Sequence, residues 1–383
     1  MRFLHTADWH LGRVFFGAHL IEDQAFALDE LSHLMRELRT ECLVISGDLY
    51  DRSVPPVEAV ELLDEFLFRT VLEDGIRVVM VAGNHDGAER LAFGSRLLEE
   101  KGLAIGTRIA PEPVTVTLGD EWGPVRIAAL PYIEPARVRS ELDEPEVRSN
   151  AEAMAAVLRR VRDRNTDRVR TILAAHCFVD GGLGSESERP LAVGGVESVP
   201  VSLFEGFEYV ALGHLHRPQQ FADGTVQYSG SLLRYSFSEI DHEKSVNAVE
   251  MDREGRCRVE RIVLPQRRKL RRIRGLFDEI LAAARDDSSR DDYLLVEILD
   301  EAPVFEAMRR LRELYPNTLH IERPSLAGTG PAELRRDHRK VETLELFSSF
   351  YRYATGSDLT EAQRSAFASV CDSLRRTEQE VTV

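Results

Sequence analysis

Residues 3–10 read FLHTADWH, and this stretch decides the fold. Phe3 to Ala7 is a run long enough for one buried strand, and Asp8 and His10 come directly after it. A second apolar run, Cys42 to Ser46, is separated from the first by Ile21 to Arg39. The apolar residues of that intervening segment recur every three or four positions, which is typical of one face of a helix. A strand, a helix and a second buried strand predict a layered α/β fold.

The same alternation continues to about residue 265. Four further short runs rich in Val, Ile, Leu and Ala predict buried strands. They are Val78 to Ala82, Arg126 to Leu130, Thr171 to Ala175 and Tyr209 to Leu212. We therefore expect residues 1–265 to form one α/β domain.

The rest of the chain differs in pattern. At 383 residues and 43.3 kDa, the chain is too long for one ordinary domain. A β/α pattern predicts a small separate domain at residues 266–328, and Pro324 to Pro331 is typical of a linker. Residues 332–383 have helical spacing. These helices either dock on the body of the protein or bind a partner, because two short amphipathic helices cannot bury their apolar faces alone.

Composition excludes several classes of protein. Hydrophobic residues make up 43% and charged residues 30% of the chain, which excludes a disordered protein. No uninterrupted apolar stretch approaches the ~18 residues of a membrane-spanning helix, and residues 1–8 lack the apolar segment of a signal peptide. The cysteines have no CxxC spacing, which argues against a zinc knuckle and favours a reducing cytoplasm; they are Cys42, Cys177, Cys257 and Cys371.

The formal net charge of −16 argues against a general nucleic-acid binder. The basic residues are unevenly distributed, however, because residues 266–274 hold six of them in nine positions. We favour contact between this basic run and nucleic acid or an acidic partner. The alternative is a solvated linker.

Val57 to Leu72 predicts a helix that starts after Pro55-Pro56. Its apolar residues cover more than one face, although a helix on a domain surface needs only one apolar stripe. Two interpretations stay open. The helix is deeply buried, or its second apolar face, together with residues 91–98, forms a homodimer contact.

Five segments place metal-ligand residues directly after an apolar strand, where α/β folds have their sites. A lone histidine in such a place is more often structural, but five such segments in one chain make coincidence improbable. Carboxylate, imidazole and amide ligands together suit Mn²⁺, Fe²⁺ or Zn²⁺, and seven candidate ligands suit two ions rather than one. The segments are D-x-H at 8–10, G-D-x-x-D at 47–51, G-N-H-D at 83–86, a lone His176 and G-H-x-H at 213–216.

These motifs, in this order, resemble the calcineurin-like metallophosphoesterase superfamily and, within it, the SbcD-type nuclease subunits that act with SbcC-type ATPases. Residues 5–12 (HTADWHLG), 176–179 (HCFV) and 228–239 (YSGSLLRYSFSE) carry further likeness to that branch. The resemblance implies a four-layer α/β/β/α metallophosphoesterase sandwich. It also implies a small β/α capping domain and a C-terminal helical segment.

The resemblance implies two Mn²⁺ ions per chain, with Fe²⁺ or Zn²⁺ as other divalent metals that would fit. Asp48 would bridge the two ions, because one carboxylate can offer an oxygen to each. The first ion would then be held by Asp8, His10, Asp48 and His216, and the second by Asp48, Asn84, His176 and His214.

The remaining site residues also follow from the resemblance. His85 would protonate the leaving oxygen or stabilise the transition state, and Asp51 would hold His85 in position; a plain loop cap is the alternative for Asp51. Arg52 would bind the scissile phosphate, and Arg13 and Arg90 would contact the DNA backbone. For each of the three arginines a surface role is the alternative.

The function implied is a Mn²⁺-dependent DNA exonuclease and endonuclease acting on ends, hairpins and double-strand breaks in repair and recombination. The chain has no G-x-x-x-x-G-K-[ST] motif, so ATP hydrolysis would come from an SbcC-type ABC ATPase. The implied assembly is a cytoplasmic heterotetramer containing a homodimer of this chain, without a membrane. The tail at 332–383 would dock on the ATPase, and residues 266–328 would help hold DNA. The alternative function is another calcineurin-like phosphoesterase, either a protein phosphatase or a nucleotide phosphodiesterase.

Overall fold

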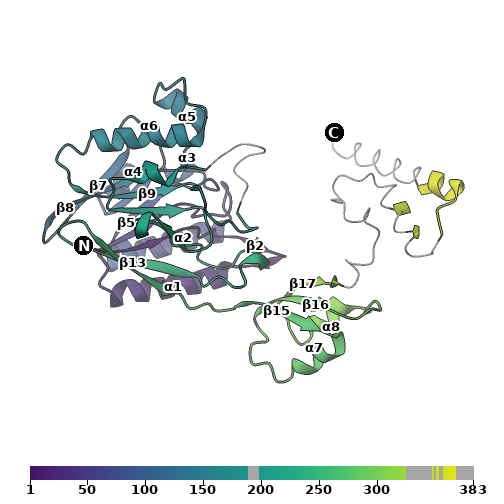
Figure 1. Ribbon diagram of the computed structural model, residues 1–383. Coiled ribbons are helices and arrows are strands. Elements are labelled where there is room, and N and C mark those ends of the chain that lie inside the picture. Colours follow the sequence, from purple (N-terminus) through teal and green to yellow (C-terminus); the bar gives the residue numbers. More distant parts are fainter. Residues whose placement is uncertain (189–197, 325–346, 349–350, 353–356, 368–383) are drawn as a thin grey trace. The chain divides into compact units, whose positions relative to one another are not determined.

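The computed structural model describes residues 1–188, 198–324, 347–348, 351–352 and 357–367 (Figure 1). Residues 1–273, 281–296 and 308–321 form one compact unit, which is built on two six-stranded sheets. The first sheet has the order β14 (Cys257–Val263), β13 (Ser245–Met251), β1 (Arg2–Thr6), β4 (Cys42–Ile45), β5 (Arg77–Val81) and β6 (Leu103–Gly106). The second has the order β11 (Gln219–Phe221), β12 (Val226–Tyr228), β10 (Tyr209–Gly213), β9 (Arg170–His176), β8 (Gly123–Ala129) and β7 (Val114–Asp120).

Helices cover the outer faces of both sheets. Figure 1 shows α1 (Ile21–Glu37) on one side of the layered sheets and α6 (Asn150–Asp163) on the other. A capping box between Ser149 and Glu152 starts α6. The other helical segments of this unit are α2 (Val57–Phe68), η1 (Arg69–Glu73), α3 (Ala88–Leu91), α4 (Ser95–Glu99), α5 (Pro135–Glu141), η2 (Val201–Phe204), η3 (Ala222–Gly224), η4 (Phe237–Glu239) and α8 (Ala307–Arg312), whose first residue lies outside it.

Side-chain alternation along the strands produces three apolar cores. In β1, Leu4 packs under α1 and α2, whereas Phe3 faces the second sheet. In β9, Ile172 faces the first sheet and Leu173 packs under α6. Successive residues of a strand point to opposite faces, so each central strand contributes to two cores. Three cores between four layers confirm the predicted α/β/β/α sandwich.

The central strands run parallel and bring their carboxyl ends to one edge. β1 pairs in parallel with β4, β4 with β5, and β5 with β6. In the second sheet, β8, β9, β10 and β12 are also parallel neighbours. Every candidate ligand lies in or just after β1, β4, β5, β9 or β10, so the two sheets present these residues together at that edge.

A third sheet has the order β15 (Leu270–Gly275), β16 (Tyr293–Ile298) and β17 (Thr318–Glu322), and the segment also contains α7 (Phe277–Ala283). Residues 270–274 of the basic run therefore belong to a strand, which the charged pattern did not predict. Arginines of the run are engaged by acidic residues: Arg268 lies 2.9 Å from Asp23, and Arg271 lies 2.9 Å from Asp287. The division of the chain at residue 265 stays a prediction.

The predicted helical tail falls mostly outside the described residues. Of the predicted helical tail at 332–383, only residues 347–348, 351–352 and 357–367 are described. Within the described part of the chain, no helix is long and apolar enough to cross a membrane.

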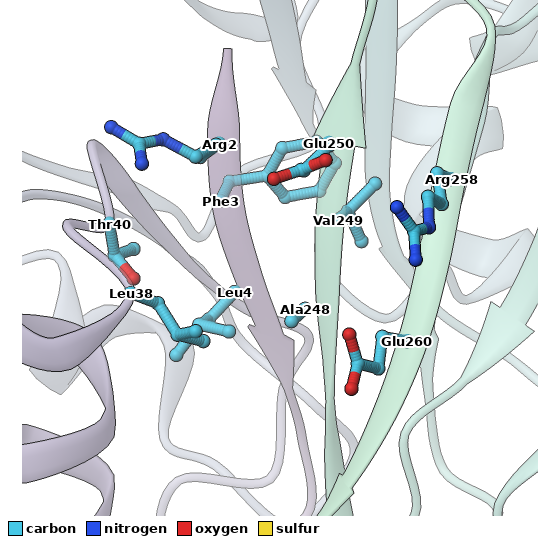
Figure 2. A pocket seen from close by; sticks show the side chains of 10 residues that line it. All are labelled: Arg2, Phe3, Leu4, Leu38, Thr40, Ala248, Val249, Glu250, Arg258 and Glu260. Atoms are coloured by element: carbon cyan, nitrogen blue, oxygen red, sulfur yellow. The ribbon is translucent and has the colours of Figure 1, made fainter.

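A cavity of about 100 Å³ lies on the first sheet, beside the carboxyl end of α1 (Figure 2). None of the candidate site residues lines it. Glu250 on β13 and Arg258 on β14 face each other across the strand pair at its rim. Its lining residues are Arg2, Phe3, Leu4, Leu38, Thr40, Ala248, Val249, Glu250, Arg258 and Glu260.

Candidate metal centre

The structure brings the predicted ligands together in two clusters. In the first cluster, one ligand atom each from Asp8, His10 and His216 lies within 4.8 Å of the others. In the second cluster, the same holds for Asp48, His176 and His214. Asn84 joins the second cluster, because its Oδ1 lies 2.9 Å from His176 Nε2 and 3.3 Å from His214 Nδ1.

Asp48 lies between the two clusters. Its Oδ2 is 3.7 Å from His10 Nε2 and 3.5 Å from His176 Nε2. Its Oδ1 accepts a hydrogen bond of 2.8 Å from the backbone N–H of His85. One oxygen is thus fixed to the loop that carries His85, and the other faces ligands of both clusters.

The donor set fits cations. Asp8 and His10 are fully buried, and Asp8 Oδ2 and His10 Nδ1 have no hydrogen-bond partner among the described residues. In the first cluster, His10 Nε2 and His216 Nε2 face each other at 3.0 Å. Buried polar groups without a partner are costly. Two imidazole nitrogens and a carboxylate that point at one position suit a divalent ion.

Electrostatics at this edge also favour positive charge. Burial, and then the neighbouring Asp48 carboxylate, raise the pKa of Asp8 well above its ordinary value. Burial lowers the pKa of His176 to about 4 and lowers the pKa of His10 and His214 strongly. The histidines are therefore neutral, with nitrogen lone pairs available, and the carboxylates repel each other until a cation is bound.

The backbone around the ligands is unusual. Asp8, His10, Asp48 and His214 all have positive φ angles, at 55°, 46°, 50° and 107°. Such conformations are costly for residues other than glycine and persist where the surrounding structure enforces them. A Cβ on Gly83 would lie 2.1 Å from Asp48 Oδ1, so glycine is required where these two loops meet.

His85 lies against the main chain of Asp51. Its Nδ1 makes a 2.8 Å hydrogen bond to the backbone carbonyl of Asp51. A carbonyl only accepts, so Nδ1 donates and Nε2 carries the lone pair. The Asp51 carboxylate instead pairs with Arg13 at 2.9 Å. Asp51 therefore positions His85 through its main chain, although its carboxylate is also close to the His10 and His85 rings.

The three arginines have different surroundings. Arg13 is mostly buried, pairs with Asp51 and lies 5.1 Å from the centre of the Tyr235 ring. Arg52 and Arg90 are exposed, after β4 and in α3. The structure thus ties Arg13 to the site and leaves the other two on the surface near the same loops.

Sequence reasoning missed Asp86, the last residue of G-N-H-D. Its carboxylate accepts backbone hydrogen bonds from Leu49, Tyr50 and Gly83, at 3.2, 3.0 and 2.8 Å. Burial, and then Asp48, raise the pKa of Asp86 to about 7. This side chain clamps the loop after β4 to the loop after β5. Its place inside a ligand motif was the signal available in the sequence.

Two further supports carried no sequence signal. The Gln24 side chain in α1 donates 2.8 Å to the carbonyl of His10 and accepts from Gly12 N–H at 3.0 Å. His5 lies in β1, just before the segment that carries Asp8 and His10. It contacts the Tyr209 hydroxyl at 3.0 Å and the Leu212 carbonyl at 3.2 Å. His5 is therefore a histidine of the core between the sheets.

Two family models match the chain. The calcineurin-like phosphoesterase model matches residues 1–218, and a model described as the type 5 capsule protein repressor C-terminal domain matches residues 266–355. A curated SbcD nuclease subunit, from Staphylococcus saprophyticus subsp. saprophyticus, is 33% identical over 375 residues, which is 98% of each chain.

Solved structures resemble the chain only loosely. TT1561 of Thermus thermophilus is 14% identical with a TM-score of 0.39, covering 68% of this chain and 98% of its own. The 5'-nucleotidase precursor of the same organism is 14% identical with a TM-score of 0.37, covering 69% of this chain and 54% of its own. At these TM-scores neither structure informs on activity.

The phosphoesterase model covers more than half of the chain and includes every candidate ligand. The curated relative extends the similarity over nearly the whole length. The chain is an enzyme of the metal-dependent phosphodiesterase class, and it belongs to the SbcD nuclease family within the calcineurin-like phosphoesterases.

Proposed function

We propose that this chain is a Mn²⁺-dependent DNA exonuclease and endonuclease that hydrolyses phosphodiester bonds at DNA ends and hairpins. The observation that carries the proposal is the position of Asp48 Oδ2 between two buried clusters of ligands. The family and the name of the curated relative support DNA as the substrate. Repair and recombination of double-strand breaks is the process that such an activity serves.

In this proposal the first ion is held by Asp8, His10, Asp48 and His216, and the second by Asp48, Asn84, His176 and His214. When bound, two such ions activate a water and neutralise charge on the phosphate. His85 acts from the protein side. Its Nδ1–H donates to the Asp51 carbonyl. Its Nε2 is therefore the nitrogen that would take up a proton and then donate it to the leaving oxygen.

The arginines complete the proposed site. Arg13 is fixed by Asp51 and contributes positive charge beside the first cluster. Arg52 and Arg90 are exposed on neighbouring loops, where guanidinium groups can take phosphate oxygens in two parallel hydrogen bonds. We propose that Arg52 contacts the scissile phosphate and that Arg13 and Arg90 contact the backbone of DNA.

The test is a comparison of substrates with added Mn²⁺. We expect linear duplex DNA to be cleaved at least about tenfold faster than a bis-aryl phosphodiester, which corresponds to ~1.4 kcal/mol of barrier. We expect little turnover of p-nitrophenyl phosphate. EDTA should stop cleavage and added Mn²⁺ should restore it, measured by gel electrophoresis and by absorbance.

The same assay separates the alternatives. Strong monoester turnover without DNA cleavage would indicate a protein phosphatase. Rapid hydrolysis of the bis-aryl phosphodiester without DNA cleavage would indicate a nucleotide phosphodiesterase. Cleavage that persists unchanged in EDTA would contradict the metal-dependent mechanism itself.

We propose an SbcC-type ABC ATPase as the partner and the cytoplasm as the compartment. The curated relative is named as one subunit of an SbcCD nuclease. This chain lacks a phosphate-binding G-x-x-x-x-G-K-[ST] motif. We assign docking on the ATPase to residues 332–383 and contact with DNA to residues 266–328.

We also propose a homodimer through α2, η1, α3 and α4. These elements and the turn between α3 and α4 expose large apolar side chains, among them Phe93 of that turn at 89% and Leu97 of α4 at 74%. Such a patch is typical of a contact surface. Leu63 and Phe66 of α2 are instead core residues, 3% and 0% exposed. The helix thus has both a buried face and an exposed apolar face.

The double variant Phe93→Glu, Leu97→Glu is expected to sediment as a monomer where the wild type sediments as a dimer, because two charges would have to be buried at the contact. Sedimentation velocity measures this. The control is Trp122→Glu, which places a charge on a residue 45% exposed outside this surface. Unchanged sedimentation of the double variant would contradict the dimer.

A further inference from the structure

A buried chain of polar groups lies behind His216. Glu239 and Lys244 are 0% and 1% exposed and pair at 2.5 Å. The Ser187 hydroxyl lies 2.7 Å from His216 Nδ1 and donates to Glu239 Oε1. The same carboxylate oxygen is 3.4 Å from His216 Nδ1. None of Ser187, Glu239 and Lys244 is among the proposed ligands, and the proposed reaction does not use them.

The direction of each hydrogen bond among these buried polar groups is fixed. The Lys244 ammonium has three donors. They go to Glu239 Oε2, to the His216 carbonyl at 2.9 Å and to the Ser231 hydroxyl at 2.8 Å. Paired in this way, Glu239 is a carboxylate, and a carboxylate only accepts. The Ser187 hydroxyl must therefore donate its single proton to Glu239.

This direction determines the tautomer of His216. Because the Ser187 proton goes to Glu239, the Ser187 oxygen can only accept from the imidazole. His216 Nδ1 therefore carries the ring proton. The lone pair is then on Nε2, the atom that faces His10 Nε2 at 3.0 Å in the first cluster. The ring is held in the state and orientation that a ligand requires.

The main chain of His216 is held by the same surroundings. Its N–H donates to Glu188 Oε1 at 2.8 Å, and its carbonyl accepts from Lys244. A buried ion pair is weak evidence for stability, since replacing such pairs with apolar residues is often neutral. Its contacts with a single ligand histidine point to positioning.

We propose that Ser187, Glu239 and Lys244 are positioning residues that fix His216 as the Nδ1–H tautomer and present its Nε2 to a divalent ion in the first cluster. The inference deepens the proposed function and rests on it. Removing an outer-shell partner of a metal-bound histidine typically costs about 10–100-fold in metal affinity.

The first experiment measures Mn²⁺ affinity of the metal-free full chain by the loss of the free-ion EPR signal. Ser187→Ala breaks the chain of polar groups but leaves the Glu239–Lys244 pair in place. It is expected to weaken Mn²⁺ binding by about 10–100-fold, while Ser187→Thr, which keeps the hydroxyl, restores it. The matched control is Ser32→Ala, because Ser32 is also buried but bonds only within α1, to the Leu28 carbonyl.

The second measurement needs no variant. ¹⁵N chemical shifts of labelled histidine in the metal-free wild type report which ring nitrogen of His216 carries the proton. Nδ1–H supports the proposal, and Nε2–H overturns it. The proposal is also overturned if a folded Ser187→Ala variant binds Mn²⁺ as tightly as wild type. That outcome would leave the proposed two-metal site standing. A wild-type chain that binds no Mn²⁺ would instead overturn the proposed function, and this inference with it.

Discussion

Asp48→Asn is expected to lower Mn²⁺ affinity at both clusters by at least about 100-fold, the upper end of what loss of an outer-shell partner costs. The amide has the shape of the carboxylate but not its charge. If its oxygen keeps the hydrogen bond from His85 N–H, its NH₂ group replaces Oδ2, the atom that lies between His10 and His176. That NH₂ group would point at the cations and repel them.

The same variant should leave the metal-free protein at least as stable as wild type. Burial, and then the Asp48 carboxylate, raise the pKa of Asp8, so the two carboxylates repel each other when no cation is present. Neutralising one of them removes that repulsion. The thermal midpoint without metal should therefore stay equal or rise, while the stabilisation by Mn²⁺, about 2.7 kcal/mol at 100 times Kd, is lost.

Two measurements check this prediction, namely metal content by mass spectrometry and thermal unfolding with and without Mn²⁺. The control is Asp120→Asn, because Asp120 is also a buried carboxylate but pairs with Arg170 and the amino terminus, at the opposite end of β1. That variant should lose stability and keep its metal. Wild-type metal content in Asp48→Asn would show that Asp48 is not the bridging ligand.

His85→Ala is expected to reduce DNA cleavage by about 10²–10⁴-fold, the range typical for loss of a general acid or base. Metal content and DNA binding should be unchanged, since His85 is not among the proposed ligands. Single-turnover cleavage rates at saturating Mn²⁺, together with metal analysis, measure both effects. Loss of metal in this variant would show that His85 is a ligand instead.

Asp51→Asn distinguishes the two ways in which His85 could be held. His85 Nδ1–H donates its hydrogen bond to the Asp51 carbonyl, which the substitution keeps. The substitution removes the charge that pairs with Arg13 and that lies 3.7 Å from His10 Nδ1. A partly exposed pair such as that with Arg13 is worth about 1 kcal/mol or less. We expect Asp51→Asn to lower the rate of DNA cleavage by about fivefold. A loss as large as that of His85→Ala would restore the carboxylate as the orienting group.

The central sheet strands and the ligand positions could be predicted because each depends on local sequence. The apolar runs before Asp8, Asp48 and Asn84 correspond to β1, β4 and β5, each followed by its ligand loop. Buried parallel strands are continuous apolar runs and stand out from their surroundings. By contrast, β15 lies in the basic run, and strand pairing there was not visible in a pattern dominated by charge.

The contacts that orient the ligands could not be predicted. Glu239 and Lys244 lie in a polar stretch with no periodicity, and their burial depends on tertiary packing. The sequence cannot show whether the carboxylate or the carbonyl of Asp51 bonds to His85, since both groups belong to the same residue. Apolar periodicity reports which face of an element is buried, but it carries no information on hydrogen-bond partners.

The pairing of the basic run with acidic residues has a consequence for salt dependence. Arg268 and Arg271 already have carboxylates as counterions within the chain. A duplex approaching this segment would displace few condensed ions, and their release is what makes protein–DNA affinity fall steeply with ionic strength. The contribution of this segment to DNA affinity would then depend only weakly on the concentration of monovalent salt.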